Sequence, residues 1–80
     1  MSKNRVFRNG DTVKHFKGHF YRIIEVEAYW HEDKDKIERL IVYKSLLNGR
    51  VCIRPYDMFC SEVDHGKYPD AKQKFRFELM

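Results

Sequence analysis

Arg54 is the residue of this 80-residue chain whose surroundings best suit ligand recognition. It stands directly before Pro55, whose ring fixes a backbone angle beside an expected tight turn, so the guanidinium group is aimed in a defined direction. A planar guanidinium group held in this way binds carboxylate or phosphate groups. The alternative is an internal salt bridge from Arg54 to Asp57 or Glu62, and the sequence leaves the two interpretations open.

Aromatic residues elsewhere in the chain are candidates for a surface beside Arg54. Tyr43, Tyr21 and Phe59 are interpreted as the walls of a shallow groove, of the kind on which peptides dock or bases stack. Packing in the core is the alternative for all three. It is the preferred interpretation for Phe59, while the two tyrosines remain open between groove and core.

A basic cluster surrounds the first expected turn, where His15, Lys17 and His19 lie close in sequence to Lys14 and Arg22. Such a hairpin suits phosphate oxygens, although a solvated turn that discourages edge-to-edge association explains the same residues. The two histidines have the four-residue spacing of a helical metal site, but the glycine between them indicates a turn. We therefore predict neither a metal site nor a cofactor.

His31 and Glu32 are an adjacent imidazole and acid, and a general acid and base of an enzyme require these two groups. They stand among Asp33, Asp35 and Glu38, so a solvated charged loop is the alternative. The chain has no glycine-rich phosphate loop and no serine nucleophile motif. Nothing in the sequence therefore requires an enzyme.

The elements that must position these residues are short strands separated by turn signals. Apolar and polar residues alternate, Lys-Gly and Asn-Gly pairs mark tight turns, and a proline begins one helical turn. The expected strands are 12–16, 19–30, 37–46, 51–54 and 75–79, with the helical turn at 55–59 and a further extended segment at 60–63. This pattern predicts an all-β fold, a small antiparallel SH3-like barrel of five or six strands with one short helical turn.

The same alternation predicts which side chains are buried and where the domain begins. Residues 24–30 alternate with a period of two, which places Ile24, Val26 and Trp30 on one face. The predicted core residues are Ile24, Val26, Trp30, Ile41, Val51, Ile53 and Phe59. We expect residues 1–11 to be a flexible lead-in and residues 12–80 to form a single domain.

Composition narrows the class of protein. The net charge is +4, and the first 22 residues carry six cationic residues and one acidic residue, which favours phosphate or acidic partners. No apolar run reaches the roughly 18 residues of a transmembrane helix, and the first residues are charged, unlike a signal peptide. The two cysteines are too few for a disulfide framework. We expect a cytoplasmic protein that does not bind a membrane.

Four segments, taken in order, carry a resemblance to a known family. They are residues 13–21, residues 31–32, residues 40–44 and residues 53–59, which includes Arg-Pro-Tyr-Asp-Met-Phe. Together they resemble the bacterial family catalogued as domain of unknown function 1653. Where that family usually has a tryptophan, two residues before its Arg-Pro pair, this chain has Cys52. The resemblance implies a short cytoplasmic bacterial domain, an SH3-like barrel with no established activity or cofactor.

The sequence thus favours a binding module over an enzyme. The expected ligand is anionic or planar, such as a nucleotide, a nucleic acid or an acidic peptide. The expected binding residues are Arg54, Tyr43, Tyr21, Lys17, His15 and His31. One alternative is an adaptor that binds a protein partner, or associates weakly with itself, through an exposed strand edge at 75–79. Another is a small hydrolase or transferase that uses His31 and Glu32.

Overall fold

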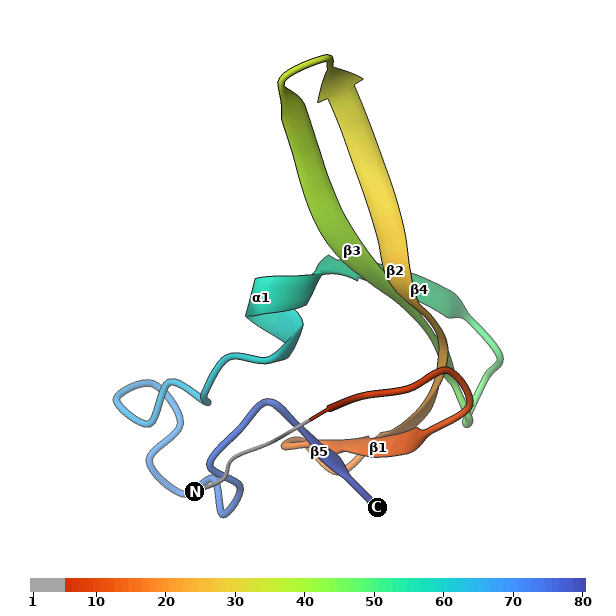
Figure 1. Cartoon of the computed structure of the whole chain (residues 1–80). Helices are drawn as coiled ribbons and strands as arrows, with labels where there is room; N and C mark the ends of the chain where they lie inside the picture. The colour runs from red at the N-terminus through yellow and green to blue at the C-terminus, as the bar shows by residue number, and fades with distance from the viewer. Residues whose placement is uncertain (1–5) are drawn as a thin grey trace.

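The computed structural model describes residues 6–80 and shows one five-stranded antiparallel sheet with the strand order β4-β3-β2-β1-β5 (Figure 1). The elements are β1 (Thr12–His15), β2 (Phe20–Asp33), β3 (Lys36–Ser45), β4 (Val51–Pro55), α1 (Tyr56–Phe59) and β5 (Phe77–Leu79). The predicted antiparallel β fold with one short helix is confirmed.

The sheet does not close, which corrects the predicted barrel. β4 and β5 are the two edges and do not pair with each other in the described part of the chain. The helix α1 and the chain after it lie across the concave side instead (Figure 1). Phe59 at the end of α1 is fully buried there, so a helix covers the core where a barrel would bring its edge strands together.

The β1–β2 hairpin turns through residues 16–19, and its geometry depends on a glycine. Gly18 has a φ angle of 100°, a conformation that side-chain-bearing residues rarely adopt. The Gly18 N–H donates to the His15 carbonyl, and the His15 N–H donates to the His19 carbonyl, both at 2.8 Å. The turn therefore keeps His15 and Lys17 at the end of β1.

A bulge in β2 decides which of its side chains face the core. Ile23 lies opposite Tyr43 and Glu25 lies opposite Val42, so Ile24 is an extra residue without a partner position. Ile23 is consequently 1% exposed, whereas Ile24 is 44% exposed. The bulge shifts the inward positions by one residue from those that simple alternation predicts.

The predicted core is therefore only partly correct. Ile41 and Phe59 are fully buried, and Val26 is partly buried against the core. The residues predicted to be buried but found exposed are Ile24, Trp30, Val51 and Ile53. On β4 it is Cys52 that lies opposite the buried Tyr43, so the residues on either side of Cys52 face outward.

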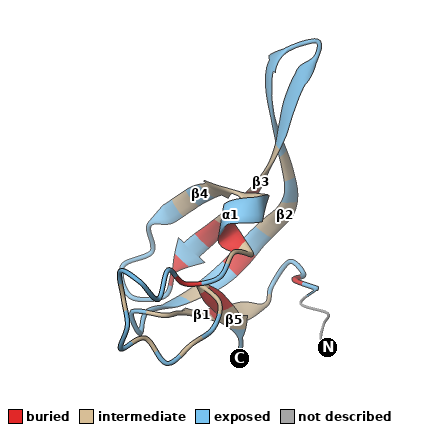
Figure 2. Cartoon of the chain, turned by 90° about the vertical axis from the view of Figure 1, so that its left-hand side faces the viewer, coloured by how far each residue is buried: buried red, intermediate tan, exposed pale blue. Residues whose placement is uncertain are grey.

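Four of the eight buried apolar residues in the described part of the chain are aromatic. Phe59 and Phe77 stack with their centroids 4.0 Å apart, and Tyr43 lies 5.2 Å from Phe59. Phe7 meets Phe59 edge to face at 5.2 Å and is 3% exposed, so the part of the expected lead-in that the structure describes packs on the domain. Buried positions gather between α1 and the sheet, while the β2–β3 hairpin is exposed toward its tip (Figure 2).

Candidate functional site

Arg54 lies on the inward face of β4, and its side chain is anchored at one nitrogen only. Its Nε donates a hydrogen bond of 3.1 Å to the hydroxyl of Tyr43, and its guanidinium carbon is 5.8 Å from the ring centroid of Phe77. In residues 6–80 no ion pair joins Arg54 to Asp57 or Glu62. The internal salt bridge is thus not formed, and the terminal amino groups of Arg54 have no hydrogen-bond or ion-pair partner among the described residues.

A second arginine, Arg76, directly precedes β5 and lines the same cavity as Arg54. Its N–H donates to the Ser61 carbonyl at 3.0 Å, and its carbonyl accepts from the Phe16 N–H at 2.9 Å, which fixes its backbone from both sides. The Nε of Arg76 is buried and has no hydrogen-bond partner among the described residues. An unmatched buried donor costs free energy in a folded protein, so it is a notable feature of this site.

His15 stands beside these arginines as a neutral ring. Its Nδ1 accepts a hydrogen bond of 3.1 Å from the Lys17 N–H, so the proton of the neutral ring is on Nε2. Burial, followed by the positive charges of Arg54 and Lys17 and by smaller effects of His19 and Arg76, lowers the pKa of His15 to about 4. The imidazole is therefore uncharged near neutral pH and able to donate through Nε2.

The loop between α1 and β5 lies on the other side of the space that Arg54, Arg76 and His15 face. Asp64 accepts hydrogen bonds from the N–H groups of Gly66 and Lys67 at 3.0 and 3.2 Å through one carboxylate oxygen, so this acid closes its own turn. The Nζ of Lys67 is 5.5 Å from the ring centroid of Tyr68, and the Nζ of Lys17 is 5.2 Å from the same centroid. Two ammonium groups thus flank one tyrosine ring.

These residues enclose a cavity of about 280 Å³, which we call the basic cavity. Its lining residues are His15, Phe16, Lys17, Arg54, Asp64, Lys67, Tyr68 and Arg76. The cationic side chains outnumber the single carboxylate, which is already used within its turn. A concave site lined by one sign of charge concentrates the electric field and attracts ions of the opposite sign.

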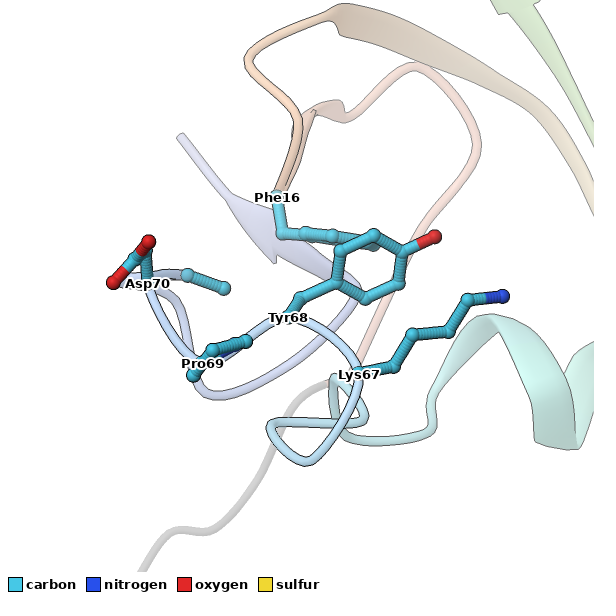
Figure 3. Close-up of a pocket in the computed structure, with 6 residues that line it drawn as sticks. Phe16, Lys67, Tyr68, Pro69 and Asp70 are labelled. Atoms are coloured by element: carbon cyan, nitrogen blue, oxygen red, sulfur yellow. The ribbon is translucent and has the colours of Figure 1, made fainter.

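A second cavity of about 270 Å³ adjoins the basic cavity and has a more apolar lining. Figure 3 shows the side chains that line it. We call it the aromatic cavity. Its lining residues are Phe16, Lys67, Tyr68, Pro69, Asp70 and Ala71. The rings of Phe16 and Tyr68 are 5.0 Å apart at 60°. Both cavities are lined by Phe16, Lys67 and Tyr68, so they are adjacent on the surface.

The structure brings together three of the residues expected to bind a ligand and separates the others. Arg54, His15 and Lys17 line the basic cavity. Tyr43 is 4% exposed, so its ring belongs to the core and only its hydroxyl reaches the site, through Arg54. The aromatic groove expected around Tyr43 is therefore not a stacking surface.

The two remaining expected residues lie elsewhere. Tyr21 contacts the rings of His15 and Tyr43 but lines a different cavity, of about 260 Å³, together with His19 and Cys52. His31 is exposed on the outer half of β2, where it lies opposite Ile37 in the β2–β3 hairpin. Figure 1 shows this hairpin extending away from the body of the domain, so His31 is remote from the basic cavity.

Sequence reasoning missed Arg76, Lys67 and the ring of Tyr68. The alternation in Phe75-Arg76-Phe77 indicated that Arg76 faces away from the two rings, but it did not place Arg76 at a cavity. No local signal marked Lys67 or Tyr68, which lie in a turn and a loop.

In residues 6–80 no cluster of three or more histidine, cysteine, aspartate or glutamate side chains has the arrangement needed to hold a metal ion. The described chain also contains no helix with the length and apolar character that crossing a membrane requires.

Comparison with known proteins identifies a family. The family described as Protein of unknown function (DUF1653) matches residues 11–79, a range that contains every strand, α1 and both cavities. No curated protein and no solved structure matches the chain. The resemblance seen in the sequence is thus confirmed, and the chain belongs to the DUF1653 family of proteins of unknown function.

Proposed function

We propose that this domain is a binding module that takes a phosphate group of its ligand in the basic cavity. The observation that carries the proposal is the convergence of Arg54 and Arg76 on one cavity with donors that no described residue engages. Like charges brought together in this way repel each other, and a bound anion removes that repulsion.

A phosphate group fits this arrangement better than a single carboxylate. A phosphate monoester carries a charge of about −1.5 to −2 near neutral pH and offers three strong acceptor oxygens. Guanidinium groups bind phosphate through paired hydrogen bonds, and lysines add charge without fixed geometry. Arg54 and Arg76 supply the guanidinium groups, Lys17 and Lys67 supply the ammonium groups, and the Nε2–H of His15 adds one neutral donor.

The substitution Arg54→Ala tests the proposal. Loss of a charged hydrogen bond is worth about 1.5 to 3 kcal/mol, so we expect the affinity for inorganic phosphate or pyrophosphate to fall by about tenfold or more. The fold loses the hydrogen bond to Tyr43 and the contact with the Phe77 ring, and removal of one of the two arginines that line the cavity lessens the repulsion between like charges there. Calorimetric titration and thermal unfolding of the same samples measure the two effects.

Asp57→Ala is the matched control, because Asp57 is exposed on α1 and lines neither cavity. We expect it to change neither affinity nor unfolding temperature appreciably. If folded Arg54→Ala protein binds the anion as tightly as the original chain, the basic cavity is not the binding site and the proposal is wrong.

The two other functions considered from the sequence gain no support from the site. Phe75 forms a bridge with Glu62, and the backbone of Arg76 is hydrogen-bonded on both sides. Of the strand edge expected at 75–79, only β5 is therefore an edge to which a partner strand could add. Adaptor function through this edge stays a prediction. His31 and Glu32, which the hydrolase or transferase hypothesis requires, are both exposed on the hairpin and line no part of the basic cavity.

A further inference from the structure

We propose that the ligand is a nucleoside phosphate, with its phosphate in the basic cavity and its base in the aromatic cavity. This inference rests on the proposed function and adds the part of the ligand that the arginines do not bind. It covers both a free nucleotide and a nucleotide unit of a single strand, because the two present the same chemistry.

The first support is that the two cavities are adjacent. Their volumes, about 270 and 280 Å³, are each below the range of about 300 to 1,000 Å³ that is usual for small-molecule sites. Phe16, Lys67 and Tyr68 line both cavities, so a ligand of ordinary size would reach from one cavity into the adjacent one. A ligand that occupies both cavities must have two unlike ends.

The second support is the chemistry of the aromatic end. Figure 3 shows the ring of Tyr68 lying against Phe16, with Pro69 below it in the same loop. Tyr68 is only partly buried, unlike the rings in the core. Partly exposed aromatic rings stack on nucleobases with little dependence on which base is bound.

The third support is the distribution of charged side chains over the two cavities. Lys17 and Lys67 hold their ammonium groups near the Tyr68 ring, where the two cavities meet and where the linkage from base to phosphate would pass. Asp70 lines the aromatic cavity and lies on the other side of Tyr68 from Lys67 in Figure 3. A carboxylate there disfavours a second phosphate and accepts hydrogen bonds from the amino groups of bases.

The test compares ligands that share a phosphate group and differ in the rest. Inorganic phosphate, phenyl phosphate, the four ribonucleoside monophosphates and a short single-stranded oligonucleotide are titrated by calorimetry and by amide chemical-shift mapping. We expect a monophosphate nucleotide to bind at least about tenfold more tightly than inorganic phosphate, because stacking of one base contributes a factor of this order. Inorganic phosphate is expected to leave the shifts of residues 69–71, which line only the aromatic cavity, unchanged, whereas nucleotides and oligonucleotides move them.

Substitutions at Tyr68 separate stacking from charge. Tyr68→Leu is expected to lower the ratio of nucleotide affinity to phosphate affinity by about tenfold, while Tyr68→Phe retains this ratio. If Tyr68→Leu does not fold, Ala71→Leu fills the aromatic cavity from a partly exposed position and is expected to have the same selective effect.

The outcomes distinguish this inference from the function on which it rests. Equal affinity for inorganic phosphate and nucleotides, or equal affinity for phenyl phosphate and nucleotides, would overturn nucleotide recognition and leave phosphate binding in place. Failure of every one of these anions to bind would overturn both. Tighter binding of the oligonucleotide than of any monophosphate identifies a single strand as the source of the unit, and the reverse order identifies a free nucleotide.

Discussion

At the scale of a single residue, the pKa of His15 shows the effect of the positive charges in the site. Its ring is wedged between Phe16 and Phe77, with centroid distances of 4.5 and 4.9 Å, and it faces the charges of Arg54 and Arg76. Burial and these charges act in the same direction, since both disfavour the imidazolium ion. The site therefore keeps a hydrogen-bond donor that adds no further charge to a crowded set of cations.

This arrangement predicts acid-sensitive stability. The pKa of His15 is about 4 in the folded chain and 6.5 as a reference value, so between these pH values the unfolded chain binds more protons. The free energy of unfolding should consequently rise with pH across this window, and stability should be lost as the pH falls below 6.5. Urea unfolding at pH 5 and pH 7 measures the difference, and His15→Gln should reduce it.

His31→Gln is the control for this measurement, because it replaces an exposed imidazole on the hairpin. We expect it to keep the pH dependence of the original chain. A His15→Gln protein whose stability still falls as steeply between pH 7 and pH 5 would show that another group causes the effect.

The residues of the site differ in how far the sequence could reveal them. Arg54 was marked by its proline, and His15 with Lys17 by a basic turn, all of which are local signals. Arg76 could not be placed beside them, because it reaches the cavity only through the pairing of β5 with β1, and long-range pairing leaves no local pattern. Tyr43 was included among the binding residues although its ring is buried, because the sequence around a strand tyrosine is similar whether its ring is buried or exposed.

At the scale of elements, β2 shows why alternation alone gave the wrong inward face. The strand existed where it was expected, but its register shifts at three places, so period-two counting from Ile24 fails. The β2–β3 hairpin also continues into the charged segment that had been expected to be a loop. There Asp33 accepts hydrogen bonds from the N–H groups of Asp35 and Lys36, at 2.8 and 3.1 Å, and closes the tip.

The outer part of this hairpin should contribute little to stability. Trp30 and Ile37 are 59% and 54% exposed, so few contacts are lost with them. Replacing residues 30–38 by Asn-Gly would join Tyr29 directly to its cross-strand partner Arg39 through a two-residue turn. We expect the free energy of unfolding, measured in urea, to change by less than about 1 kcal/mol.

Arg39→Ala provides the contrast, since Arg39 connects the base of the hairpin to the body. Its Nε donates to the Val26 carbonyl at 2.9 Å, and its guanidinium carbon lies 3.8 Å from the ring centroid of Tyr56. Loss of both contacts should cost about 1 to 2 kcal/mol. A shortened hairpin that destabilises the protein more than Arg39→Ala does would show that the exposed part supports the fold.

At the scale of the whole molecule, the core is completed by contacts between the two ends of the described chain. β5 pairs with β1, placing Phe77 opposite His15, and Phe77 stacks on Phe59 from α1. The side chain of Gln73 donates to the Lys14 carbonyl across a separation of 59 residues. An open sheet of this kind depends on the last strand to cover one side of its core.

That dependence has a kinetic consequence. Bringing β5 to β1 closes a long loop of chain, which costs conformational entropy before the contacts between them compensate for it. Proteins dominated by contacts between residues distant in sequence fold in milliseconds to seconds. We expect the β2–β3 hairpin to form early and the β1–β5 pair to form after the transition state. Phe77→Leu should then accelerate unfolding and leave the folding rate nearly unchanged in stopped-flow measurements. A folding rate that falls in proportion to the lost stability would instead place the meeting of the first and last strands at the barrier itself, so that this pairing would set the speed of folding.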